Sequence, residues 1–462
     1  MSDYPPPVPS HYRLTSRVAR SGPRSDTARL LDRMETLIEM SDGRATVPFN
    51  GLTLETAFQP IISLAHGRPV GYETLLRARD EEANVISPLD VFSAAIGRGE
   101  ATFLDGLCRA LHFRNFEQQG VDNAWLFVNL NPRALMEGDQ LGPLVEGLLD
   151  RHQLPAHRVV VEIIEATTFD ERHLADAVAF FRELGCLIAI DDFGAGQSNF
   201  GRVWRMAPDI VKLDRSMLTE ATRSPRVRRI LPGLASLVHE AGCLVVLEGI
   251  ESEEQALIAM EMDVDFVQGF FFGRPEPQIE EVGDGYRRQL DDLFDRFRNG
   301  VTEQIELTRG ALEGFTEALQ AAAAQVAAGT DAKTAIDEFA ELPGVERCYV
   351  LNENGTQIAS SLGTRSWQSA RDPRFEPLAE TDGSNWVRRP YFRRAITHPM
   401  HVHVSRPYLS AQDARTCVTL SIAVQSRGQV VVLCTDLDWE ASDSALLSPS
   451  WRPPMITLSD IK

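Results

Sequence analysis

Acidic and amide side chains stand at or near the ends of most short apolar segments between residues 57 and 273 of this chain. With one lysine among them, they are Glu73, Asn129, Asn131, Glu162, Glu165, Asp191, Asp192, Lys212, Asp214, Glu248, Glu251 and Gln268. Carboxylate and amide oxygens suit Mg²⁺ or Mn²⁺, whereas Zn²⁺ prefers nitrogen and sulfur ligands. A site with two such ions suits the in-line hydrolysis of a phosphate ester. Taken singly, each residue could instead be a surface acid or half of a surface ion pair.

The apolar segments that carry these side chains alternate with stretches of helical periodicity. They are 57–64, 69–78, 125–131, 159–165, 186–192, 210–214, 243–251 and 266–273. Alternating strands and helices indicate an α/β fold with a parallel sheet, and eight strands indicate a (β/α)8 barrel of the TIM type, whose active site lies at the carboxyl ends of the strands. Only residues 65–67 connect the first two segments. That connection is too short for a helical crossover, so we expect the first strand to run antiparallel to the others.

Composition and charge exclude several classes of protein. The 462 residues are 43% apolar and 24% charged, which is ordinary for globular domains. The formal charge of −20 opposes binding of a nucleic-acid polymer or an anionic membrane surface. Six scattered cysteines without a C-x-x-C pair indicate buried free thiols. The absence of a long apolar run and of a signal peptide predicts a cytoplasmic protein without a membrane span.

The chain divides into five predicted parts by composition and periodicity. They are a partly disordered leader (1–45), the barrel (46–278), a helical linker (279–330), an α+β domain (331–440) and a tail (441–462). Apolar residues in the linker recur at steps of three and four from Leu290 to Val326. This seam fits a helix packed on its own domain, and it fits equally a dimeric signalling helix that joins two domains.

Seven segments of the barrel resemble, in order, the motifs of the EAL family of cyclic di-GMP phosphodiesterases. They read FQPIISL…GYETLLR, FVNLNP, VEIIEAT, IDDFGAGQSN, PDIVKLD, LEGIES and VQGFFFGRP. The resemblance covers about residues 46–277, and it implies a barrel with an antiparallel first strand. It also implies hydrolysis of one phosphodiester bond of cyclic di-GMP, with two Mg²⁺ or Mn²⁺ ions per active site and linear pGpG as product.

The resemblance also implies a role for each matched position. The implied metal ligands are Glu73, Asn129, Glu162, Asp191, Asp192 and Glu248. The implied catalytic groups are Glu73, Lys212, Glu248 and Asp192. Lys212 matches the lysine that holds the attacking water, and Glu248 matches a general base or second metal ligand. The implied substrate contacts are Gln59, Arg77, Asp214 and Gln268. Glu165 and Glu251 match loop-anchoring acids.

A few positions depart from the family pattern. Thr74 stands where alanine is usual, and we expect its side chain to lie away from the chemistry. Ala195 and Asn199 stand in the loop after the aspartate pair, where threonine and serine are common. The alanine removes a hydroxyl hydrogen bond, which puts the order of that loop and dimer coupling in question. Asn131 stands where serine is common. No matched metal or water position is lost.

The segment from Trp386 to Val424 is similar to the Cache class of PAS-like sensor domains. The resemblance implies a pocket for an unidentified small ligand. Its candidate residues are Arg388, Arg389, Tyr391, Arg406 and Tyr408. The alternative is a module that serves only dimerisation. His398, His401 and His403 could form a metal site, although a surface cluster is the favoured interpretation.

Three hypotheses of function follow. The first is an active cyclic di-GMP phosphodiesterase of signal transduction, which the C-terminal domain regulates and which family resemblance predicts to be a homodimer. The second is a catalytically silent EAL receptor that binds cyclic di-GMP and signals to a partner. The third is a scaffold that acts through the linker helix alone. The chain has no GG(D/E)EF motif, so a bifunctional enzyme is not expected.

Overall fold

The computed structural model describes residues 24–41, 43–130, 141–164, 171–196, 200–280, 284–363, 381–410 and 416–439. The tail, most of the leader, and Asn131, Glu165 and Asn199 lie outside the described residues. The chain forms two units, and each is described by itself. The first contains Met1–Ser216, Ser236–Ser252 and Val264–Gly283, and the second contains the rest.

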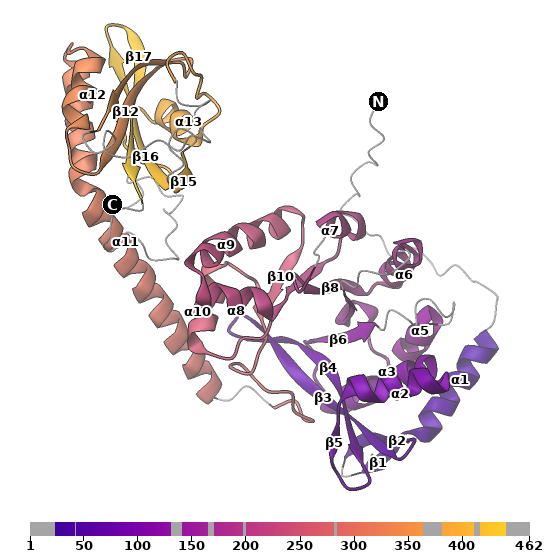
Figure 1. The fold of residues 1–462 in the computed structure, drawn as a ribbon. Coiled ribbons are helices and arrows are strands. Elements are labelled where there is room, and N and C mark those ends of the chain that lie inside the picture. The colour runs from indigo at the N-terminus through magenta and orange to yellow at the C-terminus, as the bar shows by residue number, and fades with distance from the viewer. Residues whose placement is uncertain are drawn as a thin grey trace. The chain divides into compact units, whose positions relative to one another are not determined.

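Eight strands of the first unit close into a barrel, as the sequence predicts (Figure 1). They are β3 (Leu52–Ser63), β4 (Arg68–Asp80), β6 (Trp125–Leu130), β7 (Val159–Ile164), β8 (Leu187–Phe193), β9 (Ile210–Leu213), β10 (Leu244–Leu247) and β11 (Phe266–Val267). β3 pairs antiparallel with β4 and with β11, and the other neighbours pair in parallel. The short loop before Gly67 turns the chain directly from β3 into β4, as its length requires.

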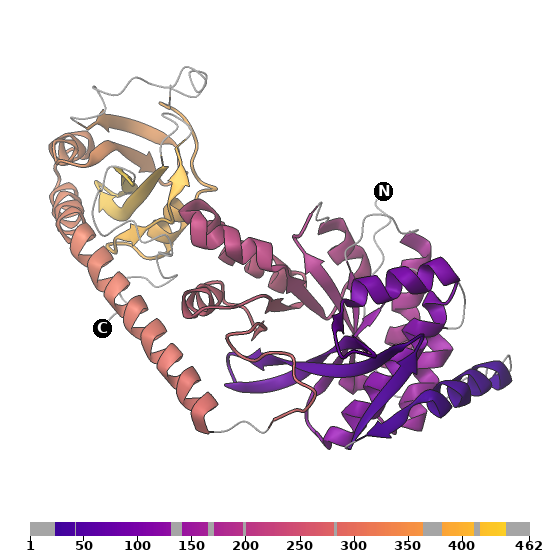
Figure 2. The ribbon, with the colours of Figure 1, turned by 60° about the horizontal axis from the view of Figure 1, so that its bottom comes forward.

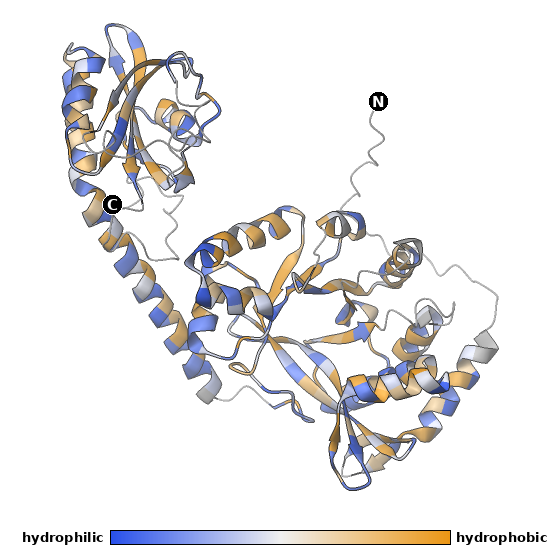
Figure 3. Cartoon of the chain, viewed as in Figure 1, coloured by the Kyte–Doolittle hydropathy of each residue, from blue (hydrophilic) through white to orange (hydrophobic). Residues whose placement is uncertain are grey.

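Strands β6 to β11 are mostly apolar because both of their faces are largely buried (Figure 3). Apolar side chains, among them Ile61, Phe127 and Val160, pack in a buried cluster of the barrel strands. Gly71 on β4 is required there, because a Cβ at this position would lie 2.6 Å from Cε2 of Phe127.

Other helices and short strands of the first unit precede the barrel strands or lie between them in the chain. They are α1 (Arg24–Leu37), β1 (Glu39–Ser41), β2 (Arg44–Phe49), β5 (Val85–Ile86), α2 (Pro88–Arg98), α3 (Ala101–Gln119), α5 (Leu141–Arg151), the 3₁₀ turn Ala156–Arg158, α6 (Glu171–Leu184) and α7 (Phe200–Met206). α1 seats Leu31 and Met34 against Gly147 of α5 and Gly106 of α3, where a Cβ would collide. Residues assigned to the leader by composition therefore include an ordered helix.

The second unit contains a long helix, α11 (Asp284–Ala327), which runs as one continuous rod in Figure 2. The second unit also contains most of three shorter helices, α8 (Arg215–Arg223), α9 (Pro225–Glu240) and α10 (Glu253–Glu261). The first two residues of α8 and the end of α9 from Ser236 belong to the barrel unit. Seam residues of the last part of α11, such as Leu319 and Val326, are buried in the core of the C-terminal sheet. For this part, the structure supports the interpretation of a helix packed on its own domain.

The C-terminal sheet is wholly antiparallel and forms an α+β module, with strand order β13-β12-β17-β16-β14 and β15 paired to β16. The strands are β12 (Val345–Asn352), β13 (Gln357–Leu362), β14 (His403–Val404), β15 (Tyr408–Leu409), β16 (Thr416–Ser426) and β17 (Gln429–Asp438). The end of α11 and α12 (Ala332–Ala340) cover one face of the sheet, and α13 (Pro390–Thr397) covers the other (Figure 1). None of the described helices is long and apolar enough to cross a membrane.

Candidate active site

Lys212 of β9 lies among carboxylates that come from four other strands or strand ends. Its side chain is 1% exposed. Its Nζ lies 2.5 Å from Oε1 of Glu162, 2.5 Å from Oε1 of Glu248, 3.1 Å from Oδ1 of Asp191 and 3.3 Å from Oε2 of Glu73. The barrel thus brings together side chains separated by up to 175 residues in the chain (248 − 73). Lys212 is therefore the common ion-pair partner of these four carboxylates.

Glu73 of β4 is held by amide groups on both of its oxygens. Asn129 donates from Nδ2 to Oε1 at 3.0 Å, and Gln268 donates from Nε2 to Oε2 at 2.6 Å. Nε2 of Gln268 also lies 3.3 Å from Oε1 of Gln59, and Gln59 in turn donates to the carbonyl of Gly273 at 3.3 Å. Four predicted site residues therefore form one hydrogen-bonded chain that fixes the orientation of Glu73.

Asp191 and Asp192 occupy an irregular step at the end of β8. The pairing of β8 with β9 advances three residues on β8, from Ile190 to Phe193, while β9 advances two. Asp192 also has a φ of 56°, in the left-handed region that few non-glycine residues adopt. Adjacent residues of a regular strand point to opposite faces, and a bulge can re-aim them. Here the irregular step brings oxygens of Asp191, Asp192 and Glu248 within 4.8 Å of one another.

The electrostatics of the site reflect an excess of buried negative charge. Burial raises the pKa of Glu162 well above its usual range. Burial also raises the pKa of Glu248 to about 8 and that of Asp192 to about 6, and neighbouring carboxylates such as Asp191 add to both. Burial lowers the pKa of Lys212, but the carboxylates around it hold that pKa well above its ordinary value. One lysine does not compensate five carboxylates, so the site favours additional cations.

The donor set fits hard divalent cations. Oε2 of Glu162 is buried and has no hydrogen-bond partner in the described part of the chain. The clustered oxygens of Asp191, Asp192 and Glu248 have the ligand chemistry of Mg²⁺, Mn²⁺ or Ca²⁺, and no nitrogen or sulfur ligand lies among them.

Three other predicted residues lie at the margin of this cluster. Arg77 is half-buried on β4; burial lowers its pKa and the charge of Glu73 opposes that shift, which places the two groups within electrostatic reach. Asp214 accepts a hydrogen bond from the backbone N–H of Ser216 at 3.0 Å, and its charge contributes to the raised pKa of Asp192. Glu251 is exposed.

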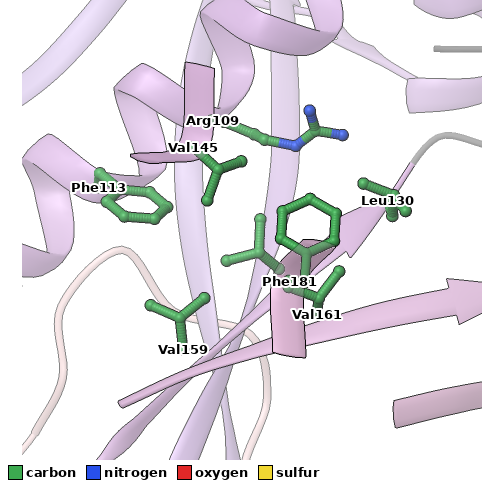
Figure 4. Close-up of a pocket in the computed structure, with 8 residues that line it drawn as sticks. Arg109, Phe113, Leu130, Val145, Val159, Val161 and Phe181 are labelled. Atoms are coloured by element: carbon green, nitrogen blue, oxygen red, sulfur yellow. The ribbon is translucent and has the colours of Figure 1, made fainter. Parts of the chain in front are cut away.

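The structure adds two buried contacts that the sequence patterns do not identify. Thr74 donates from Oγ1 to the carbonyl of Phe127 at 2.9 Å, so its side chain ties β4 to β6. Arg109 of α3 is 2% exposed, pairs with Asp105 at 2.7 Å and donates to the carbonyl of Asn129 at 3.4 Å. Arg109 borders a small, mainly apolar cavity between α3, the strands and α6 (Figure 4). The sequence contains one signal of the buried Asp105–Arg109 pair, namely an acid and an arginine four residues apart within the apolar run of α3.

Comparison with known proteins agrees with the predicted family. Residues 48–275 match the family described as EAL domain. Cyclic di-GMP phosphodiesterase PdeF of Escherichia coli is 27% identical over 218 residues, which cover 46% of this chain and 29% of PdeF. Cyclic di-GMP phosphodiesterase RocR of Pseudomonas aeruginosa is 28% identical over 231 residues, which cover 48% of this chain and 58% of RocR. The chain therefore spans less than two thirds of the length of either curated relative.

A solved structure has a similar fold over a longer part of the chain. The YkuI protein of Bacillus subtilis, with an EAL domain and in complex with substrate c-di-GMP and calcium, superposes with a TM-score of 0.70 at 22% identity. The superposition covers 84% of this chain and 96% of that chain, so the likeness of fold extends beyond the barrel. Residues 48–275 thus match the EAL domain family, and relatives of this region include proteins named cyclic di-GMP phosphodiesterases.

Proposed function

We propose that this EAL domain hydrolyses one phosphodiester bond of cyclic di-GMP and releases linear pGpG. The observation that carries the proposal is the cluster around Lys212, in which Glu73, Glu162, Asp191 and Glu248 all lie within 3.3 Å of its Nζ. A cluster of buried carboxylates of this kind is costly to a fold unless cations and function maintain it.

Two Mg²⁺ or Mn²⁺ ions would be held by Glu73, Asn129, Glu162, Asp191, Asp192 and Glu248. When bound, such ions lower the pKa of a water molecule and stabilise charge on the phosphate oxygens. Lys212 and Glu248 are close enough to contact the same water, with the ammonium group donating a hydrogen bond and the carboxylate accepting the proton. Gln268 and Asn129 keep Glu73 fixed while the reaction proceeds. Arg77 would donate hydrogen bonds to a phosphate of the substrate.

The alternative is an EAL receptor that binds cyclic di-GMP without cleaving it. One feature favours this alternative: Ala195, in the turn directly after the aspartate pair, has no hydroxyl group to bond within that loop. The retained carboxylates and Lys212 favour the enzyme.

The remaining parts of the proposal concern regulation and location. The C-terminal α+β module would bind a small ligand and regulate the barrel, and the chain would act as a homodimer. The six cysteines are buried and unpaired, which supports a reducing, cytoplasmic location.

The test is conversion of cyclic di-GMP by the purified chain, followed by chromatography, with Mg²⁺ or Mn²⁺ present. We expect wild type to release pGpG and Glu73→Gln to release none. Glu55→Gln is the matched control, because Glu55 lies on β3 and pairs with Arg79 at the surface. Binding of cyclic di-GMP without turnover in either metal would support the receptor instead.

A further inference from the structure

Asn129 lies where strand β6 has already parted from one of its two neighbours. The pairing of β6 with β4 runs from Trp125 to Phe127. On its other side, the pairing of β6 with β7 continues through Asn129 to Leu130. The ladder with β4 therefore ends before Asn129, so other groups must hold this side of the strand.

Two side chains bond to carbonyl groups of β6 in this region. Oγ1 of Thr74 donates to the carbonyl of Phe127 at 2.9 Å. Nη2 of Arg109 donates to the carbonyl of Asn129 at 3.4 Å, and the charge of the guanidinium assists this long bond. Figure 4 shows the side chain of Arg109 extending along the cavity toward Leu130, the residue that follows Asn129. Arg109 thus contacts the backbone of β6 at Asn129 itself.

Stability alone does not explain the buried pair of Asp105 and Arg109. Their side chains are 7% and 3% exposed, and Nη2 of Arg109 lies 2.7 Å from Oδ2 of Asp105. An apolar pair of similar volume is often as stable as a buried ion pair, or more so. Nη1 of Arg109 is also buried without a hydrogen-bond partner among the described residues, which adds to the cost. The surrounding cavity is mainly apolar, so the pair points to a role beyond the packing of α3.

The residue that Arg109 contacts belongs to the candidate active site. Asn129 donates from Nδ2 to Oε1 of Glu73 at 3.0 Å, and its Oδ1 is the atom that can ligate a cation. Both atoms follow the backbone closely, because the side chain of asparagine is short. Removal of a group that holds a metal ligand from behind typically lowers metal affinity or activity by about 10- to 100-fold.

We propose that Arg109, paired with Asp105, is a positioning residue that fixes the backbone of Asn129 and thereby the cation site beside Glu73. The inference rests on the proposed function, because Asn129 matters to it as a ligand of a divalent cation. Binding of Mg²⁺ does not require hydrolysis, so the two proposals can fail separately.

The test compares Mg²⁺ binding to the full chain, freed of metal, by calorimetry and thermal unfolding. The variant is Asp105→Leu/Arg109→Met, which replaces the pair by apolar side chains and leaves no buried charge alone. We expect it to unfold in EDTA at or above the temperature of wild type, with a dissociation constant for Mg²⁺ raised about tenfold or more. The Mg²⁺ concentration that gives half-maximal turnover of cyclic di-GMP should rise by a similar factor.

Phe113→Leu is the matched control, because Phe113 lies four residues along α3 and lines the same cavity. Its ring has no donor for the carbonyl of Asn129, so this variant should lower the unfolding temperature and leave the affinity for Mg²⁺ unchanged. Arg109→Lys is the second variant, in case the double variant does not fold. It keeps a charge beside Asp105 on a shorter side chain without the guanidinium fork, and it should bind Mg²⁺ more weakly than wild type.

Wild-type affinity for Mg²⁺ in both Arg109 variants would overturn the inference and leave the proposed enzyme standing. An equal loss of affinity in Phe113→Leu would also overturn it, because packing of α3 would then explain the effect. A chain that binds Mg²⁺ with this dependence on Arg109, but hydrolyses no cyclic di-GMP, would refute the enzyme and leave the role of Arg109 standing.

Discussion

Nζ of Lys212 lies 2.5 Å from Oε1 of Glu162, and both side chains are at most 1% exposed. A buried pair of this kind contributes little net stability, but removal of one partner leaves an uncompensated charge in the interior. Its retention in the barrel therefore points to function more than to folding.

Replacement of Lys212 by methionine tests this interpretation. We expect Lys212→Met to lose activity by about 100-fold or more, because a charged donor at the reacting centre is gone. In EDTA we expect a loss of about 3 kcal/mol in the free energy of unfolding. Turnover of cyclic di-GMP and urea denaturation measure the two effects. Lys333→Met is the control, because Lys333 is half-exposed on α12. A stable and active Lys212→Met variant would contradict the proposed site.

Divalent cations should stabilise the barrel and be required for turnover. Mg²⁺ at one hundred times its dissociation constant should raise the free energy of unfolding by about 2.7 kcal/mol. EDTA should abolish turnover, and excess Mg²⁺ or Mn²⁺ should restore it. Asp191→Asn should lose most of the stabilisation by Mg²⁺, because Asp191 lies in the oxygen cluster with Asp192 and Glu248. Asp263→Asn is the control, because Asp263 is exposed. Asp209→Asn would not serve, since Asp209 accepts a hydrogen bond from the backbone N–H of Ile188. Equal stabilisation of both variants by Mg²⁺ would refute a cation at this cluster.

Thr74 is expected to affect stability and not catalysis. Thr74→Ala removes the hydrogen bond from Oγ1 to the carbonyl of Phe127, which should cost about 1 kcal/mol. The rate should stay close to that of wild type, because this hydroxyl contacts no acidic residue of the site. Thr53→Ala is the control, because Thr53 is exposed on β3, and it measures the effect of a threonine-to-alanine change in a strand on the free energy of unfolding. A rate loss larger than the stability change explains would place Thr74 in the catalytic machinery.

Gly71 should not tolerate a side chain. A Cβ there would lie 2.6 Å from Cε2 of Phe127, so Gly71→Ala should destabilise the barrel by about 1–3 kcal/mol. The second change Phe127→Leu should recover part of this loss in a double-mutant cycle, because the smaller side chain makes room. Gly97→Ala, in a helix with open space around the Cβ, should not destabilise the protein. If the effects of Gly71→Ala and Phe127→Leu on the free energy of unfolding were additive, the new Cβ would not collide with the ring of Phe127.

Glu35 of α1 should give part of the pH dependence of stability. His152, with Nε2 3.3 Å from Oε1 of Glu35, and Arg114, at 2.9 Å from Oε2, lower the pKa of this carboxyl. A lowered pKa means that the contribution is complete above the ordinary range of glutamate, about pH 4.3, and is lost as the pH falls through the lowered value. Wild type should therefore exceed Glu35→Gln in stability at neutral pH, by less than about 1 kcal/mol, and the difference should shrink in acid.

Urea denaturation at several pH values measures the effect of Glu35. Glu39→Gln on the exposed strand β1 is the control and should show no such convergence. A difference between wild type and Glu35→Gln that stays constant from neutral pH into acid would contradict the assignment.

The sequence by itself determined the strands of the barrel and which of them carry chemistry. Apolar runs of strand length recur with helical stretches between them, and the short connection near Gly67 leaves the first pair no geometry but an antiparallel one. Glu73, Glu162 and Glu248 could be assigned to one mouth because the ends of barrel strands meet there. These properties depend on local pattern and connection length, which a single sequence contains.

The tertiary structure alone decided how the side chains meet. A regular strand would separate Asp191 and Asp192 to opposite faces, and the extra residue of β8 relative to β9 brings both to one cluster. The same holds for Arg109 behind Asn129 and for Arg389 beside Tyr408, which are joined across elements distant in the chain. Strand register and side-chain burial result from packing between such elements, so no local pattern in the sequence specifies them.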